Sequence, residues 1–83
     1  MSQTATHRAI EAVWRIEAAS VIAGVARLVR DVGVAEELAQ DALVAALERW
    51  PDTGVPDNPG AWLMTTATVS YTHLRAHETG RNL

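Results

Sequence analysis

The sequence predicts an all-α fold, in which an antiparallel helical hairpin is followed by a third helix after a Pro-rich loop. Apolar residues recur at steps of three and four over the first half of the chain, as they do on one face of a helix. Three prolines and two glycines then fall within residues 50–60, which separates this half from the rest of the chain. A chain of 83 residues has room for one small domain of this kind.

The first helix is predicted from Thr6 to about Val32. Gly33 is predicted to end it, because glycine adopts the left-handed conformation that often closes a helix. Residues 31–33 would then form a turn short enough to fold the next helix back as an antiparallel neighbour. The apolar stripe of this helix, with one longer gap, consists of Ile10, Val13, Trp14, Val21, Ile22, Val25, Leu28, Val29 and Val32.

The second helix is predicted from Val34 to about Arg49. Glu36 and Glu37 fall in its expected first turn, where the positive end of the helix dipole favours carboxylates. Its inner face is expected to pack on the first helix. The inner-face residues are Leu38, Ala42, Ala45 or Ala46, and Trp50.

A second stripe runs along the opposite face of this helix, and most of it is acidic. Its members are Glu37, Gln40, Asp41, Val44 and Glu48. Glu37 and Asp41 are like charges four residues apart, which costs roughly a few tenths of a kcal/mol in an isolated helix. We therefore expect either an ordinary solvated surface or a face that keeps these charges for binding.

Residues 50–60, "WPDTGVPDNPG", are predicted to be a loop because prolines cannot continue a helix. Asn58 is predicted to cap the third helix. Pro59 suits the first helical position, where its missing N–H would have had no partner. Residues 61–64 then open the helix.

Trp14 and Trp50 are expected in the core rather than at a ligand site, because both lie on apolar helical faces. Trp62 is also expected in the core. Past Met64 the sequence is rich in threonine and other β-branched residues. Each of these costs roughly 0.5–0.7 kcal/mol relative to alanine in a helix. The tail is therefore predicted to be poorly ordered or weakly helical.

Composition and charge limit the possible functions. Cysteine is absent, which excludes disulfides and thiolate metal sites. No apolar run approaches a membrane span, and the N-terminus lacks the features of a signal peptide, so we expect a cytoplasmic protein without membrane contact. Residues 1–67 hold five arginines and nine acidic residues, a net charge of −4, which would repel a phosphate backbone.

The sequence offers no candidate catalytic site, because no nucleophile and base are arranged in a recognisable motif. His73 and His77 lie four residues apart, with Glu78 beside them, but a third ligand at metal-binding spacing is missing. We therefore expect a non-enzymatic protein without a cofactor or metal. A small metal-dependent enzyme built around the two histidines is an alternative interpretation.

Two segments together carry a family resemblance. "AEELAQDALVAALERWP", followed by "GVPDNPGAWLMTTA", resembles region 2 of the extracytoplasmic-function (ECF) group of bacterial RNA polymerase sigma factors, within the sigma-70 family. The resemblance covers about residues 7–67. It implies a helical module that directs core RNA polymerase to promoters in transcription initiation. The alternative is a helical protein-interaction module with no nucleic acid role.

The resemblance also implies roles for particular residues. The matching residues of the second helix in the family dock on the clamp coiled coil of the polymerase β′ subunit, and here they are Glu36, Glu37, Gln40 and Asp41. The family's loop after this helix takes part in capturing a flipped promoter base, which makes Asp52, Asp57 and Asn58 the candidate DNA-binding residues. This loop lacks an aromatic residue on which a base could stack. An anti-sigma factor is a further candidate partner.

The third helix of such proteins continues into a run rich in arginine, lysine and asparagine. Here, from Thr68, stands "TVSYTHLRAHETGRNL", which resembles the peptide produced when a gene fragment is translated through a sequencing-adapter joint. We therefore expect residues 1–67 to be an incomplete sigma region 2-like domain and residues 68–83 to be a non-native tail. A genuine, divergent C-terminus is the alternative. Without the basic run, the chain is expected to bind polymerase but not promoter DNA.

Overall fold

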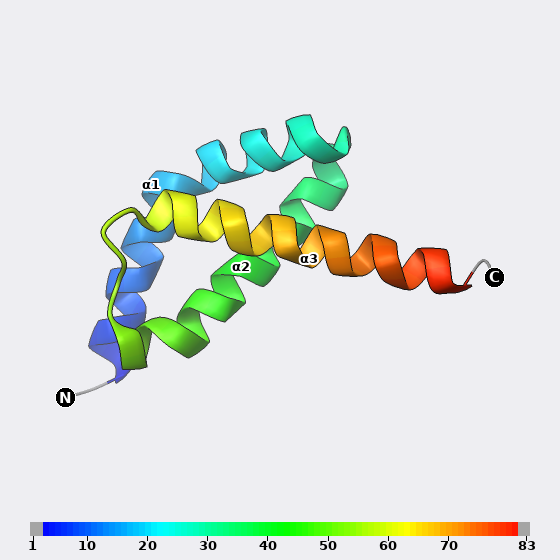
Figure 1. Cartoon of the computed structure of the whole chain (residues 1–83). Helices are drawn as coiled ribbons and strands as arrows, with labels where there is room; N and C mark the ends of the chain where they lie inside the picture. The colour runs from blue at the N-terminus through cyan, green and yellow to red at the C-terminus, as the bar shows by residue number, and fades with distance from the viewer. Residues whose placement is uncertain (1–2, 82–83) are drawn as a thin grey trace.

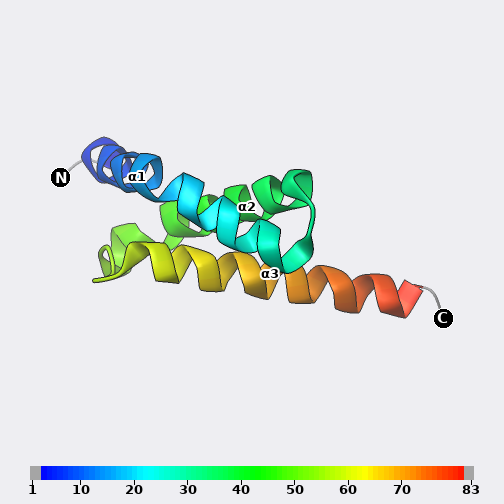
Figure 2. The same ribbon diagram turned by 90° about the horizontal axis from the view of Figure 1, so that it is seen from above.

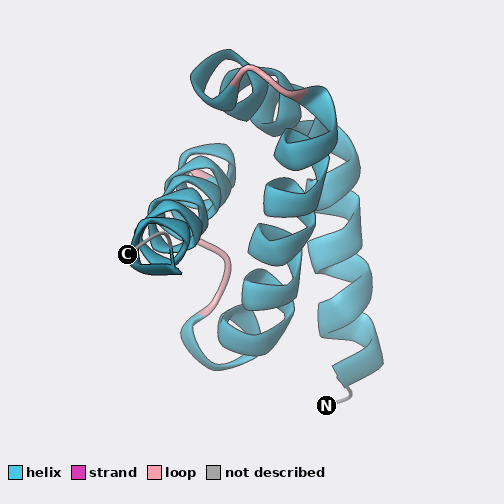
Figure 3. Cartoon of the chain, turned by 90° about the vertical axis from the view of Figure 1, so that its right-hand side faces the viewer, coloured by secondary structure: helices cyan, strands magenta, loops and turns pink. Residues whose placement is uncertain are grey.

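A computed structural model describes the backbone of residues 3–81 and the side chains of residues 5–73. Three helices make up the fold: α1 (Gln3–Val29), α2 (Val32–Thr53) and α3 (Pro59–Arg81). The hairpin of α1 and α2 lies against α3, and each helix contacts the other two (Figures 1 and 3). No strand occurs within residues 3–81, so the all-α prediction is confirmed.

The turn of the hairpin lies earlier than predicted. Helix α1 ends at Val29, and Arg30 adopts the left-handed conformation with φ of 62°. The N–H of Arg30 donates to the carbonyl of Ala26 at 2.7 Å. Asp31 is the N-cap of α2, since its side chain accepts a hydrogen bond from the N–H of Val34 at 3.0 Å.

The prediction that Gly33 ends the first helix, with a turn at residues 31–33, is therefore wrong. Arg30 supplies the left-handed residue that the sequence pattern assigned to Gly33, and the cap at Asp31 starts α2 two residues sooner. Glu36 and Glu37 consequently lie beyond the first turn of α2 rather than within it.

The C-terminus of α2 is later than predicted. The helix continues through Pro51 to Thr53, although residues 50–60 were expected to form a loop. Pro51 cannot donate the backbone hydrogen bond to the carbonyl of Leu47, four residues earlier, and it lies in the last turn of the helix. The hydroxyl of Thr53 donates to the carbonyl of Arg49 at 3.2 Å. The N–H of Gly54 donates to the carbonyl of Trp50 at 2.8 Å, with a φ of 87° that favours glycine.

The start of α3 is confirmed. The side-chain oxygen of Asn58 accepts a hydrogen bond from the N–H of Ala61 at 3.2 Å, and Pro59 is the first helical residue. The side chain of Glu17 on α1 approaches this end of α3. A Cβ atom on Gly60 would lie 2.5 Å from Oε1 of Glu17, so a larger residue at this position would displace that carboxylate. The negative carboxylate is favourable beside the positive end of the α3 dipole.

The tail differs from our expectation, because α3 continues as one helix to Arg81. The threonines are accommodated by hydrogen bonds to the preceding turn: the hydroxyl of Thr68 donates to the carbonyl of Met64 at 2.7 Å, and that of Thr72 to the carbonyl of Thr68 at 3.2 Å. Tyr71 packs partly buried against the core. The C-terminal end of α3 extends beyond the hairpin in both views (Figures 1 and 2).

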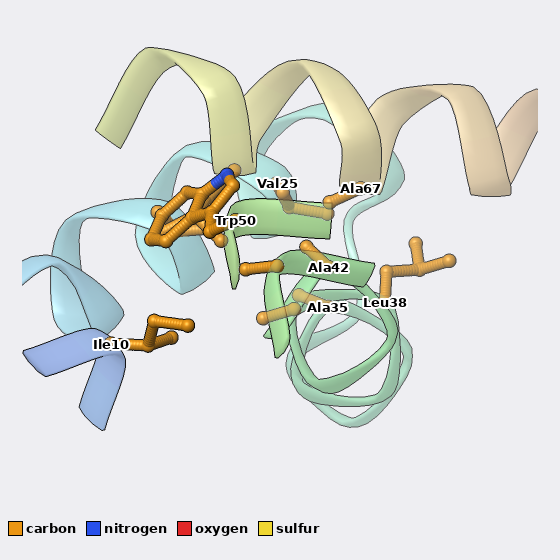
Figure 4. Close-up of a cluster of buried hydrophobic side chains, with 11 residues drawn as sticks. Ile10, Val25, Ala35, Leu38, Ala42, Trp50 and Ala67 are labelled. Atoms are coloured by element: carbon orange, nitrogen blue, oxygen red, sulfur yellow. The ribbon is translucent and has the colours of Figure 1, made fainter. Parts of the chain in front are cut away.

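The core forms where the three helices meet, and alanines of α2 lie at its centre (Figure 4). Such small side chains allow α1 and α3 to approach α2 closely. The buried residues are Ile10, Val21 and Val25 of α1; Ala35, Leu38, Ala39, Ala42, Ala46 and Trp50 of α2; and Leu63 and Ala67 of α3. The inner face of α2 is therefore as predicted, with Ala46 rather than Ala45 buried.

Aromatic packing joins the end of α2 to the start of α3. The rings of Trp50 and Trp62 meet edge to face, with centroids 5.1 Å apart. Trp50 is buried, while Trp14 and Trp62 are partly buried against the core, as the sequence predicted. Leu28 and Val32 depart from the predicted stripe and are 55% and 61% exposed, because they flank the turn beyond the last buried residues.

Removal of residues 69–83 is expected to lower the free energy of unfolding by about 1 kcal/mol, because Tyr71 loses its partly buried contacts. For a domain of this size, the melting temperature should fall by about 4–8 °C, which circular dichroism would measure. The sequence alone led us to expect little change. Tyr71→Ala in the full chain should reproduce most of the loss, and equal melting of all three proteins would show that Tyr71 adds nothing.

Candidate functional site

The four predicted polymerase-binding residues lie together on the outer face of α2. Glu36, Glu37, Gln40 and Asp41 are all exposed. The helix is oriented by the residues between them, since Ala35, Leu38, Ala39 and Ala42 are buried on the opposite face. The helical spacing of three and four thus places all four polar side chains in solvent, and none of them packs in the core.

The charge on this face is strongly one-sided. Helix α2 contains five acidic residues, and Arg49 is its one basic residue. Val44, which is 50% exposed, continues the face one turn beyond Asp41. The close pair Glu37 and Asp41 opposes helix formation rather than assisting it. This face is therefore available for binding, and nothing in the packing requires its charge.

Two open hollows flank this acidic stretch, one on each side of α2. The first lies between α1 and α2 and is lined by Ile22, Gly33, Glu36, Glu37 and Gln40. The second lies between α2 and α3 and is lined by Val34, Glu37, Leu38, Asp41, Val69, Ser70 and His73. Glu37 borders both hollows, so it forms the ridge between them.

The three predicted DNA-binding residues are also exposed but do not share one element. Asp52 lies in the last turn of α2, whereas Asp57 and Asn58 lie in the loop before α3. The side-chain oxygen of Asn58 is already engaged in capping α3. The loop carries no aromatic side chain and two of these residues are acidic, so the group is poorly suited to grip phosphates.

The alternative metal site lies in part outside the described side chains. His73 is exposed and borders the second hollow, while the side chains of His77 and Glu78 lie outside the described residues. Among the side chains that the structure describes, no three histidine, aspartate or glutamate residues are placed to hold a metal ion. None of the helices in the described range is long and apolar enough to cross a lipid bilayer.

Comparison with known protein families gives a match over most of the chain. The family model described as Sigma-70 region 2 matches residues 13–79. The chain belongs to the sigma-70 region 2 family. The sigma factor family is a non-enzymatic family of transcription factors, and the three-helix architecture is consistent with its region 2 bundle.

Individual relatives of this sigma-70 region 2 chain include a probable ECF RNA polymerase sigma factor, SigI, of Mycobacterium tuberculosis, in two strains. Each is 31% identical over 75 residues, which is 90% of this chain and 26% of that protein. An uncharacterized protein of Rhizobium meliloti is 47% identical over 38 residues, or 46% of this chain and 9% of that protein. The chain thus spans about a quarter or less of the relatives it matches. No solved structure matches it.

Sequence reasoning missed two residues of this sigma-70 region 2 domain. Ile22 and Gly33 line the hollow on the α1 side, next to three of the four predicted polymerase-binding residues. Ile22 was assigned to the apolar stripe alone, and Gly33 was interpreted as a helix stop. Ile22 carries no sequence signal for binding, because its proximity to Glu36 depends on how α1 and α2 pack. Gly33 precedes Glu36 by three residues on α2, but the sequence pattern had placed it in the turn before that helix.

Proposed function

We propose that this chain is the region 2 module of an ECF sigma factor and that it docks on core RNA polymerase through Glu36, Glu37, Gln40 and Asp41. The β′ clamp coiled coil is the proposed partner surface. In the whole protein, this docking would bring the polymerase to promoters in transcription initiation. An anti-sigma factor could regulate the protein by covering the same face.

The observation that supports docking is the exposed, acidic outer face of α2. Its polar residues make no contribution to the core, and its like charges cost helix stability. A basic partner would convert this repulsion into attraction, because complementary charges speed association and fix the register of an interface. Membership of the sigma-70 region 2 family supports core RNA polymerase as that partner.

We further propose that Asp52, Asp57 and Asn58 contact promoter DNA only in the longer protein, and through base edges. Carboxylates and amides can form hydrogen bonds with base edges, whereas carboxylates repel phosphates. The exposure of the three residues supports this role.

The segment 68–83 is proposed to stand in place of a native, basic continuation of α3. Its support is compositional: it holds two arginines and one acidic residue where the family has a run of basic and amide side chains. The family match itself continues to residue 79. The boundary near residue 68 is therefore proposed on the sequence of the tail alone.

Reversing the charge of two docking residues tests the proposal. The double variant Glu37→Lys with Asp41→Lys is expected to bind core polymerase about 10–100-fold more weakly, since each reversed charge would face a basic partner. Its free energy of unfolding should change by about 0.5 kcal/mol or less, because both side chains are exposed. Binding would be measured by fluorescence anisotropy with labelled chain and core polymerase.

A matched control changes the net charge by the same +4 at exposed positions of α1, through Glu11→Lys with Ala12→Lys and Ala19→Lys. This control should retain the parent affinity for polymerase. Equal losses in this control and in the Glu37 and Asp41 variant would mean that net charge alone explains the effect. Unchanged affinity in the Glu37 and Asp41 variant would remove the docking assignment.

A further inference from the structure

The hollow between α1 and α2 lies beside the acidic face of α2. We call it the Ile22 hollow, and it is lined by Ile22, Gly33, Glu36, Glu37 and Gln40. Ile22 is half-buried and packs against the core, which holds it in place. Three of the four proposed docking residues surround it, so apolar and acidic groups lie side by side in one concave surface.

Gly33 leaves the hollow open. It lies in the first turn of α2, is exposed, and does not have a positive φ. Any side chain at this position would extend from α2 beside Glu36 and Glu37. A Cβ atom at this position would lie 3.3 Å from Oδ1 of Asp31, so glycine suits the cap and also keeps this part of the hollow free of a side chain.

We infer that the Ile22 hollow receives one apolar side chain from a basic helix of core RNA polymerase, while Glu36 and Glu37 meet positive charges beside it. The inference rests on the proposed function and adds an anchor to it. Charge complementarity selects a basic partner, and an apolar anchor in a preformed concave surface is the usual centre of binding energy in an interface. Both walls belong to long helices that pack on the core, so the hollow requires no rearrangement to be filled.

The hollow on the other side of α2 is the competing site for the anchor. It is the more apolar of the two, since Val34, Leu38 and Val69 line it beside Glu37 and Asp41. The Ile22 hollow has one apolar side chain, but three of the proposed docking residues line it and all of its residues precede 68. We place the anchor on the α1 side because more of the docking residues gather there.

Filling the hollow without changing charge tests the inference. Gly33→Leu is expected to weaken binding to core RNA polymerase by about tenfold or more, because its side chain occupies the space for the anchor. Gly33→Ala is the matched control and should remain within about twofold of the parent. Both variants place a Cβ atom 3.3 Å from Oδ1 of Asp31, so any disturbance of the cap is common to both. Both should melt within a few degrees of the parent or higher.

The outcomes separate this inference from the proposed function. If Gly33→Leu binds like the parent while the Glu37 and Asp41 reversal loses affinity, the hollow is not the anchor site and the docking assignment stands. If Val69→Asp weakens binding and Gly33→Leu does not, the anchor lies on the α3 side. If no variant affects binding, both proposals fail. Equal losses in Gly33→Ala and Gly33→Leu would assign the effect to the Asp31 cap and overturn the inference.

Discussion

Replacing Trp50 with alanine is expected to cost about 3–5 kcal/mol, the range for removing a large buried aromatic side chain. Trp50 is 2% exposed, and its ring packs edge to face on Trp62. A domain of 83 residues has a total stability of roughly 4–12 kcal/mol. The variant should therefore be largely unfolded or melt far below the parent, which urea titration followed by circular dichroism would show.

Trp50→Phe is the control for this loss. The indole Nε1 of Trp50 is buried and has no hydrogen-bond partner among the described residues, and Figure 4 shows it directed toward α3. An unsatisfied buried donor costs about 1–3 kcal/mol. Phenylalanine keeps an aromatic ring and removes that donor, so its loss should be well below that of alanine. Similar, small losses for both substitutions would mean that Trp50 does not anchor the core.

The chain as it stands is expected to show no salt-sensitive binding to a single-stranded minus-ten oligonucleotide. Replacing residues 68–83 with an arginine- and asparagine-rich continuation of α3 is expected to create such binding. Residues 1–67 carry a net charge of −4, so the unmodified chain offers few counterion-releasing contacts. With about four phosphate contacts, the slope of log K against log salt is about −2.8, and a fourfold rise in salt would weaken binding about 50-fold.

Fluorescence anisotropy at two salt concentrations would measure both slopes. A continuation of the same length with glutamine in place of every arginine is the control, and its slope should stay near zero. Tight, salt-sensitive binding by the unmodified chain would show instead that residues 68–83 are functional, and the tail proposal would be abandoned.

Much of the fold could be predicted because local chemistry and packing agree at most positions. Asn58 and Pro59 mark the start of α3 in the sequence, and the structure uses them as expected. The helix ends were harder, because Gly33 and Pro51 are strong stop signals that the structure overrides. The cap at Asp31 and the position of Pro51 in a last turn decided those boundaries. The sequence of the tail also did not indicate that Tyr71 would pack against the core.

The sequence predicted the exposed face of α2 but not the hollow beside it. Spacing along α2 alone places Glu37, Gln40 and Asp41 opposite the buried alanines, and the structure finds them exposed. The Ile22 hollow joins residues eleven or more positions apart on two helices. Its existence depends on the register of α1 against α2, which no periodicity within one helix determines. The roles of these residues in binding remain predictions.

The ring contact between Trp50 and Trp62 has a consequence for the loop that carries Asp57 and Asn58. It holds together the two ends of a segment of roughly twelve residues, and closing such a segment costs about 2 kcal/mol of chain entropy. Packing of the helices compensates for this loss of entropy when the protein folds, before any ligand binds. Gly54 and Asn58 are held by hydrogen bonds to the helix ends, so a DNA base that bound the loop would need to immobilise only residues 55–57.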